Sequence, residues 1–139
     1  MSTDQHNQSF WTKYIWSTDH KIIGIQYGIT SLVWLLFGFG LMMIMRYQLA
    51  YPDTPVPIVG ALLGDGGLLP PEMYNSLGAM HGTIMIFLGV VPLAFGAFGN
   101  YFVPLQIGAI DMAFPKLNAA SYWTYFAGSV IMAVGFFVP

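Results

Sequence analysis

One histidine stands in the middle of a long apolar run, in the stretch GAMHGTIMIF, residues 78–87. Within a membrane, an imidazole must hydrogen-bond a neighbouring helix, line a water cavity, or bind a metal or cofactor. At helical spacing His81 shares its face with Met85 and Leu88, which would make a soft apolar slot beside the ring. Such a slot suits a flat macrocycle whose iron takes an imidazole nitrogen. An interhelical hydrogen bond explains a lone histidine equally well.

The same helix carries glycines on one side of the histidine. At 100° per residue, four glycines lie on the same side of the helix, next to the face of His81. These glycines are Gly78, Gly82, Gly89 and Gly96. A row of glycines lets a second backbone approach closely. Ordinary helix packing accounts for this row, and a cofactor is not required by it.

Composition indicates where these residues lie. Of 139 residues, 56% are hydrophobic and 7% are charged, whereas soluble domains carry about 25% charged residues. Residues 22–45, 73–110 and 117–139 contain no Asp, Glu, Lys or Arg, and about 20 apolar residues span a bilayer. We predict an all-α, polytopic transmembrane helix bundle with no nucleic-acid partner. The absence of cysteine excludes disulfides and thiolate metal sites within this sequence.

Helix-breaking residues divide the apolar runs. The second run is too long for one span, and Gly99, Pro104, Gly108 and Pro115 punctuate its end. The predicted segments are a cytoplasmic N-terminal segment 1–21, transmembrane helix 22–46, external loop 47–72, transmembrane helix 73–102, cytoplasmic loop 103–117 and transmembrane helix 118–139. The third span stops without a polar flank, which is typical of a fragment of a longer chain.

The lysines suggest an orientation for these spans. Lys13, Lys21 and Lys116 fall on one side of a three-span arrangement, and the predicted external loop has neither Lys nor Arg. The positive-inside rule therefore places the N-terminus and loop 103–117 in the cytoplasm. Aromatic residues near span ends, Trp16, Tyr47, Tyr122 and Trp123, are typical of an interfacial belt. Before the first span, we interpret His20 and Ser17 or Thr18 as capping or interface contacts, and Pro92 is expected to bend the second helix.

Several stretches together resemble a known family. STDHKIIGIQYG, HGTIMIF, FGNYFVPLQIGAIDMAFPKLNAASYW and the MR that closes the first span are similar to subunit I of the haem-copper oxygen reductases, most closely the cytochrome c oxidases. The resemblance covers most of residues 17–139. Its most specific part is GNYFVPLQIGAIDMAFPKLN, because the order and spacing of Gly, Pro, Asp and Asn there would hardly recur by chance.

The resemblance implies a bundle of about twelve transmembrane helices, of which this N-terminal fragment holds the first three. In the family, dioxygen is reduced to water at a high-spin haem paired with copper. Electrons arrive from cytochrome c through a low-spin haem, and electron transport is coupled to proton transport across the membrane. The high-spin haem and copper ligands would lie in later helices, so the fragment is not expected to be catalytic alone.

The resemblance also implies roles for particular residues. His81 matches an axial ligand of the low-spin haem iron, and Arg46 matches the arginine that hydrogen-bonds the formyl group of haem A. Asp111 matches a proton collector at the mouth of an uptake pathway, with Asn100 and Asn118 ordering water behind it. Without the family, Arg46 would be expected to extend to the interface. Asp111 and the two asparagines would then be ordinary solvated groups at helix ends.

Partners and alternatives follow from the same resemblance. We expect oxidase subunits II and III, cytochrome c, membrane lipid and, as a further candidate, a respiratory supercomplex. The location would be the bacterial cytoplasmic or the mitochondrial inner membrane. A quinol oxidase of the same superfamily is an alternative. A second is a non-catalytic membrane subunit or transporter segment in which His81 and Asp111 relay protons without haem.

Overall fold

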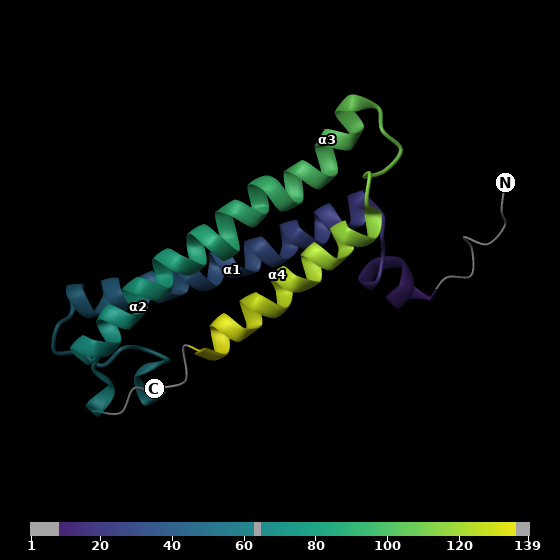
Figure 1. The fold of residues 1–139 in the computed structure, drawn as a ribbon. Helices are drawn as coiled ribbons and strands as arrows, with labels where there is room; N and C mark the ends of the chain where they lie inside the picture. The colour runs from purple at the N-terminus through teal and green to yellow at the C-terminus, as the bar shows by residue number, and fades with distance from the viewer. Residues whose placement is uncertain (1–8, 63–64, 136–139) are drawn as a thin grey trace. The chain divides into compact units, whose positions relative to one another are not determined.

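The computed structural model describes residues 9–62 and 65–135, and all regular structure in these residues is helical (Figure 1). The principal helices are α1 (His20–Ala50), α2 (Pro71–Thr83), α3 (Gly99–Ile107) and α4 (Pro115–Gly135), with the π-helical segments η5 (Ile84–Val90) and η6 (Pro92–Phe98) between α2 and α3. Short elements are η2 (Trp11–Ile15), η3 (Gly60–Leu62) and η4 (Asp65–Gly67). The all-α fold class is confirmed for the described residues.

α1 is longer at both ends than the predicted span 22–46. Its start is supported by two local hydrogen bonds: the Asp19 backbone N–H donates to Ser17 Oγ at 3.1 Å, and the Lys21 N–H donates to Asp19 Oδ1 at 3.0 Å. These side chains satisfy N–H groups that a first helical turn leaves without partners. The helix can therefore begin before the charge-free run does.

The second long helix runs without interruption from Pro71 to Ile107, beyond the predicted 73–102. Its middle is π-helical on both sides of Val91, with Pro92 at the start of η6. Proline has no N–H to give to the ordinary α-helical bond, so a local change of hydrogen-bond register there is expected. The helix ends at Gly108, whose φ of 73° is left-handed. Glycine adopts that conformation at no steric cost.

Two helices are long and apolar enough to cross a membrane, namely His20–Ala50 and Pro71–Ile107. α4 forms but is not one of them within the described residues, because polar side chains such as Asn118, Ser121 and Thr124 occupy its first half. Residues 1–8, 63–64 and 136–139, which belong to the predicted N-terminal segment, external loop and third span, lie outside the described residues. The third span therefore stays a prediction.

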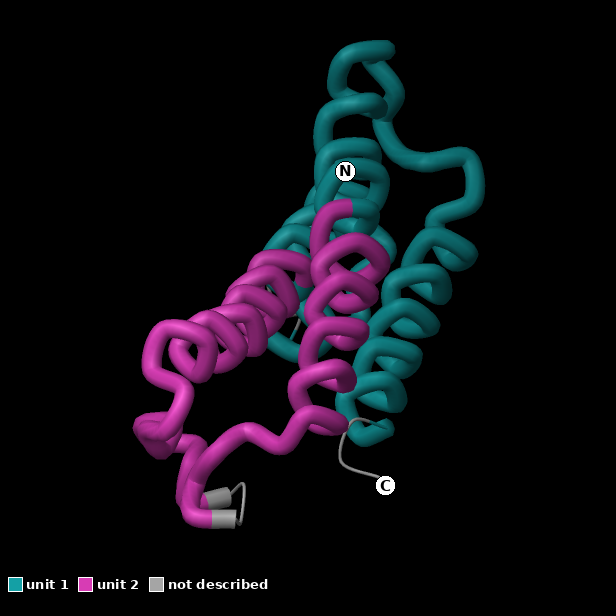
Figure 2. Tube along the Cα trace, turned by 90° about the vertical axis from the view of Figure 1, so that its left-hand side faces the viewer, with its two compact units in different colours: residues 1–30, 91–139 teal, residues 31–90 magenta. Residues whose placement is uncertain are grey.

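The chain divides into two compact units (Figure 2): residues 31–90 form one, and residues 1–30 with 91–139 form the other. In the 31–90 unit, a Cβ on Gly89 would lie 2.5 Å from Leu35 Cδ2, and one on Gly78 would lie 3.3 Å from Met45 Cε. The missing side chains therefore let α1 residues pack closely, as the glycine row suggests. Gly82 differs, since a Cβ there would meet nothing within 4 Å.

The other unit has its own core of Ile23, Tyr27, Ala97 and Tyr122. Gly96 makes room for this core, because a Cβ at Gly96 would lie 2.5 Å from Tyr27 Cδ1. Tyr122, interpreted from its sequence position as an interfacial residue, is buried here and its hydroxyl lies 3.0 Å from Thr30 Oγ1. Tyr122 therefore packs between helices, and its place at the membrane interface stays a prediction.

Candidate functional site

His81 lies in the last turn of α2 and is half-buried. Its Nδ1 is 2.8 Å from the backbone carbonyl oxygen of Gly38 on α1, within the 31–90 unit. A carbonyl oxygen can only accept a hydrogen bond, so Nδ1 carries the proton and donates it. In the neutral imidazole, the second ring nitrogen, Nε2, then keeps its lone pair. A backbone carbonyl on one nitrogen and a lone pair on the other is the usual arrangement of a metal-ligating histidine.

The surroundings of His81 fit a large cofactor better than a bare ion. No group of three or more His, Cys, Asp or Glu that could hold a metal ion occurs in the described part of the chain. A haem iron is already coordinated by its macrocycle and needs only axial ligands, such as one imidazole, from the protein. A Cβ added at Gly82, the residue after His81, would touch nothing within 4 Å, so no other side chain packs on that glycine. The engaged Nδ1 of His81 and its uncommitted Nε2 meet the requirement for one imidazole ligand.

Arg46 lies on the same helix as Gly38 and in the same unit. It follows Gly38 by two turns of helix, about 12 Å along the axis. The Arg46 side chain is exposed, and it makes no ion pair or hydrogen bond with the residues that the structure describes. The guanidinium is therefore free to reach a group that lies along α1.

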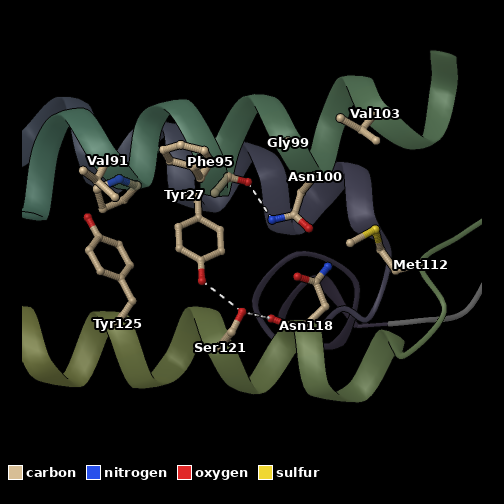
Figure 3. A pocket seen from close by; sticks show the side chains of 12 residues that line it. Tyr27, Val91, Phe95, Gly99, Asn100, Val103, Met112, Asn118, Ser121 and Tyr125 are labelled. Atoms are coloured by element: carbon tan, nitrogen blue, oxygen red, sulfur yellow. Dashed lines mark hydrogen bonds between the residues drawn. The ribbon is translucent and has the colours of Figure 1, made fainter. Parts of the chain in front are cut away.

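A second candidate site is an open pocket of about 650 Å³ in the other unit (Figure 3). Asn100 from α3 and Asn118 from α4 point toward one another across it. The pocket is lined by Tyr27, Val91, Pro92, Phe95, Gly96, Gly99, Asn100, Val103, Met112, Asn118, Ser121 and Tyr125. The fold thus brings together two of the three polar residues that the sequence singles out.

Hydrogen bonds orient the polar groups around this pocket. Asn100 Nδ2 donates to the Gly96 carbonyl at 2.6 Å. Ser121 Oγ donates to the Asn118 carbonyl at 2.7 Å, so the Tyr27 hydroxyl, 3.0 Å from Ser121 Oγ, must be the donor in that pair. Asn118 Nδ2 is buried and has no hydrogen-bond partner among the described residues. A buried amide donor needs a partner, and a water in the pocket would supply one.

Asp111 is not part of the pocket lining. It lies in the loop between α3 and α4, its side chain is exposed, and its Oδ1 accepts the backbone N–H of Met112 at 2.7 Å. The neighbouring Met112 does line the pocket. The carboxylate therefore stands in solvent one residue away from the pocket wall.

His20 is a residue whose position the sequence does not reveal. It is 1% exposed, and its Nδ1 donates to the Asn100 backbone carbonyl at 2.8 Å. It is therefore a buried contact between α1 and α3, so the interpretation as a capping residue is wrong, whereas the interpretation as an interface contact stays a prediction. Tyr27 and Ser121 were missed as well. Their only signal is a hydroxyl inside or beside a charge-free run, which does not identify its partner.

The chain is similar over most of its length to known oxidase subunits. A family model described as cytochrome C and quinol oxidase polypeptide I matches residues 22–139. Cytochrome c oxidase subunit 1 of Synechocystis sp. is 44% identical over 137 residues, which cover 98% of this chain and 22% of that protein. Cytochrome c oxidase subunit 1 of Thermostichus vulcanus is 45% identical over 125 residues, which cover 88% of this chain and 20% of that protein. The alternative cytochrome c oxidase subunit 1 of Bradyrhizobium diazoefficiens is 38% identical over 134 residues, which cover 96% of this chain and 21% of that protein. The chain spans about a fifth of the length of these relatives.

Proposed function

Because the chain belongs to the family of cytochrome c and quinol oxidase polypeptide I, we propose that it supplies one low-spin haem ligand and the proton-uptake entrance of a proton-pumping terminal oxidase. The whole protein would reduce dioxygen to water with electrons from cytochrome c. The high-spin haem and copper would be held by later helices of the whole subunit. The names of the similar proteins favour cytochrome c, whereas the family description also includes quinol oxidases.

The hydrogen bond from His81 Nδ1 to the Gly38 carbonyl carries the ligand proposal. It leaves Nε2 with the lone pair that an iron requires, and it holds the ring in one tautomer. The bound haem, proposed to be haem A, supplies an iron that accepts and passes on single electrons. Arg46 would hydrogen-bond the formyl group of this haem. A cation at that place favours the electron-rich form and so raises the reduction potential.

The proton-entrance proposal rests on the pocket between Asn100 and Asn118. The exposed carboxylate of Asp111 would be the first proton acceptor on the cytoplasmic side. The unpartnered Nδ2 of Asn118 offers a donor to water inside the pocket. Asn100, oriented by its bond to the Gly96 carbonyl, leaves its Oδ1 able to accept from such a water. Ordered water between two amides would carry protons inward from the loop.

We further propose which partners and which membrane surround this chain. Oxidase subunits II and III would pack against it, cytochrome c would deliver electrons, and lipid would cover the faces that meet the bilayer. Assembly into a respiratory supercomplex is an additional candidate. The membrane would be the bacterial cytoplasmic or the mitochondrial inner membrane. Many large apolar side chains are exposed in the described residues, including Leu36 at 72% and Phe95 at 77%, and these require an apolar partner.

A reduced-minus-oxidised spectrum of the purified whole complex tests this function. We expect the absorption of a low-spin haem A, together with oxygen consumption driven by reduced cytochrome c. Oxidation of quinol but not of cytochrome c would instead support the quinol oxidase alternative. If the purified complex contains no haem, the result would support the remaining alternative, a non-catalytic proton-relay or transporter subunit.

Topology gives an independent prediction. Single cysteines replacing Asp53 and Lys116, both exposed, should react with a membrane-impermeant reagent from opposite faces of intact vesicles. The reason is that Lys116 lies in a lysine-bearing segment, whereas the loop holding Asp53 has no basic residue. Labelling is measured in a background without other reactive cysteines. Reaction of both positions from the same face would contradict the proposed arrangement of spans.

A further inference from the structure

Gly38 packs against the helix that carries His81 more tightly than a side chain would allow. A Cβ at Gly38 would lie 2.7 Å from Met85 Sδ, 2.8 Å from Met85 Cγ and 3.5 Å from Ile84 Cγ2. The first two separations are well below the usual contact distance between non-bonded heavy atoms. The carbonyl of this same residue accepts the His81 hydrogen bond at 2.8 Å. Gly38 therefore both provides the acceptor and leaves the space that Met85 fills.

The two contacts are mechanically linked. Met85 follows His81 by about one turn and lies on the same side of its helix. A side chain at residue 38 would push on the Met85 side chain at both Cγ and Sδ. The two helical segments would separate where the Nδ1···O contact lies. A hydrogen bond weakens steeply as it lengthens and bends.

We propose that Gly38 is a positioning residue for His81, acting through its carbonyl and through its lack of a side chain. The bond from Nδ1–H sets the plane and tautomer of the imidazole and increases the basicity of Nε2. A more basic ligand stabilises the ferric over the ferrous iron and lowers the reduction potential. This inference rests on the proposed role of His81 as a haem ligand. It adds that the potential of the low-spin haem is set partly by a backbone group on α1.

The test uses the complete oxidase complex with Gly38→Ala and Gly38→Val. Gly40 is the matched control, because it lies on the same helix and a Cβ there would meet nothing within 4 Å. We expect the Gly38 variants to shift the low-spin haem absorption band and to raise its midpoint potential, valine more than alanine. Gly40→Ala and Gly40→Val should keep the wild-type band and potential. Equal behaviour of the two glycine positions would overturn the inference.

A rescue variant separates positioning from general damage to the helix. Met85→Ala removes Cγ and Sδ, the two atoms that a methyl group at residue 38 would strike. The double variant Gly38→Ala/Met85→Ala should therefore have the band position and potential of Met85→Ala alone. If Gly38→Ala loses the low-spin haem entirely, the double variant should regain it. Failure of the double variant to recover would overturn the positioning role.

His81→Ala, measured in parallel, distinguishes this inference from the function on which it rests. If His81→Ala keeps the low-spin haem, the proposed ligand is wrong. If His81→Ala loses that haem while the Gly38 and Gly40 variants behave alike, the ligand proposal stands and only the role of Gly38 fails.

Discussion

Replacement of His81 by alanine is expected to abolish the low-spin haem signal of the assembled oxidase. The substitution removes Nε2, the atom that we propose as the iron ligand, and it also removes the Nδ1 bond to Gly38. Oxygen consumption should be lost as well, because electrons would no longer pass through this haem. The measurement is the reduced-minus-oxidised spectrum of the purified complex, with oxygen uptake recorded on the same sample.

Thr83→Ala is the control for this experiment. Thr83 lies in the same turn of α2, is exposed, and its hydroxyl donates only to the Ala79 carbonyl at 2.8 Å. Changes at such surface positions usually alter stability by less than about 0.5 kcal/mol. Wild-type spectra are therefore expected for Thr83→Ala. A low-spin spectrum that survives His81→Ala in a fully assembled complex would reject the ligand assignment and favour the structural role of an interhelical hydrogen bond.

Replacement of Asp111 by asparagine is expected to slow turnover and to reduce or abolish proton pumping while leaving the haem spectra normal. Asparagine keeps the size of the side chain, and its Oδ1 can still accept the Met112 N–H. The local turn should therefore persist, and only the charge and the proton acceptor are removed. We expect oxygen consumption to fall by about tenfold. This is less than the roughly hundredfold or more typical of a group that transfers a proton directly to a reacting atom, because solvent water can also deliver protons to the pocket. Oxygen uptake and proton release are measured on vesicles that contain the variant.

Asp53→Asn provides the matched comparison, because Asp53 is also an exposed loop aspartate. It lies in the loop that we place on the opposite face of the membrane. This variant should consume oxygen and pump protons at wild-type rates. If Asp111→Asn behaves in the same way as Asp53→Asn, Asp111 is an ordinary surface charge and the proposed entrance is wrong.

The helices of this protein can largely be predicted from its apolar runs and breakers. Long stretches without charge form α1 and the helix from Pro71 to Ile107, because backbone polar groups in an apolar surrounding must bond within their own segment. Gly108 ends the second helix for a local reason, its left-handed φ of 73°. Boundaries were less predictable, since side-chain capping by Ser17 and Asp19 extends α1 beyond the apolar run. The π-helical turns beside Pro92 were also not predicted beyond a bend.

The candidate sites were predictable in residue type but not in their contacts. An imidazole between two glycines in an apolar run already suggests either a ligand or an interhelical bond. The acceptor is a backbone carbonyl that lies 43 residues earlier in the chain. Every residue carries the same backbone carbonyl, so no pattern of side chains could have identified Gly38. The same holds for His20, whose partner is the Asn100 carbonyl.

Local pattern and long-range packing thus account for different properties of this protein. Membrane character, helical class and family depend on which residue types follow one another, and these are properties of the sequence. The pairing of Asn100 with Asn118 around one pocket depends on how α3 and α4 meet. Burial of Tyr122, the solvent-facing carboxylate of Asp111 and the tautomer of His81 depend on tertiary packing as well. Such contacts join residues far apart in the chain, and their geometry arises only when helices pack and each buried polar group finds a partner.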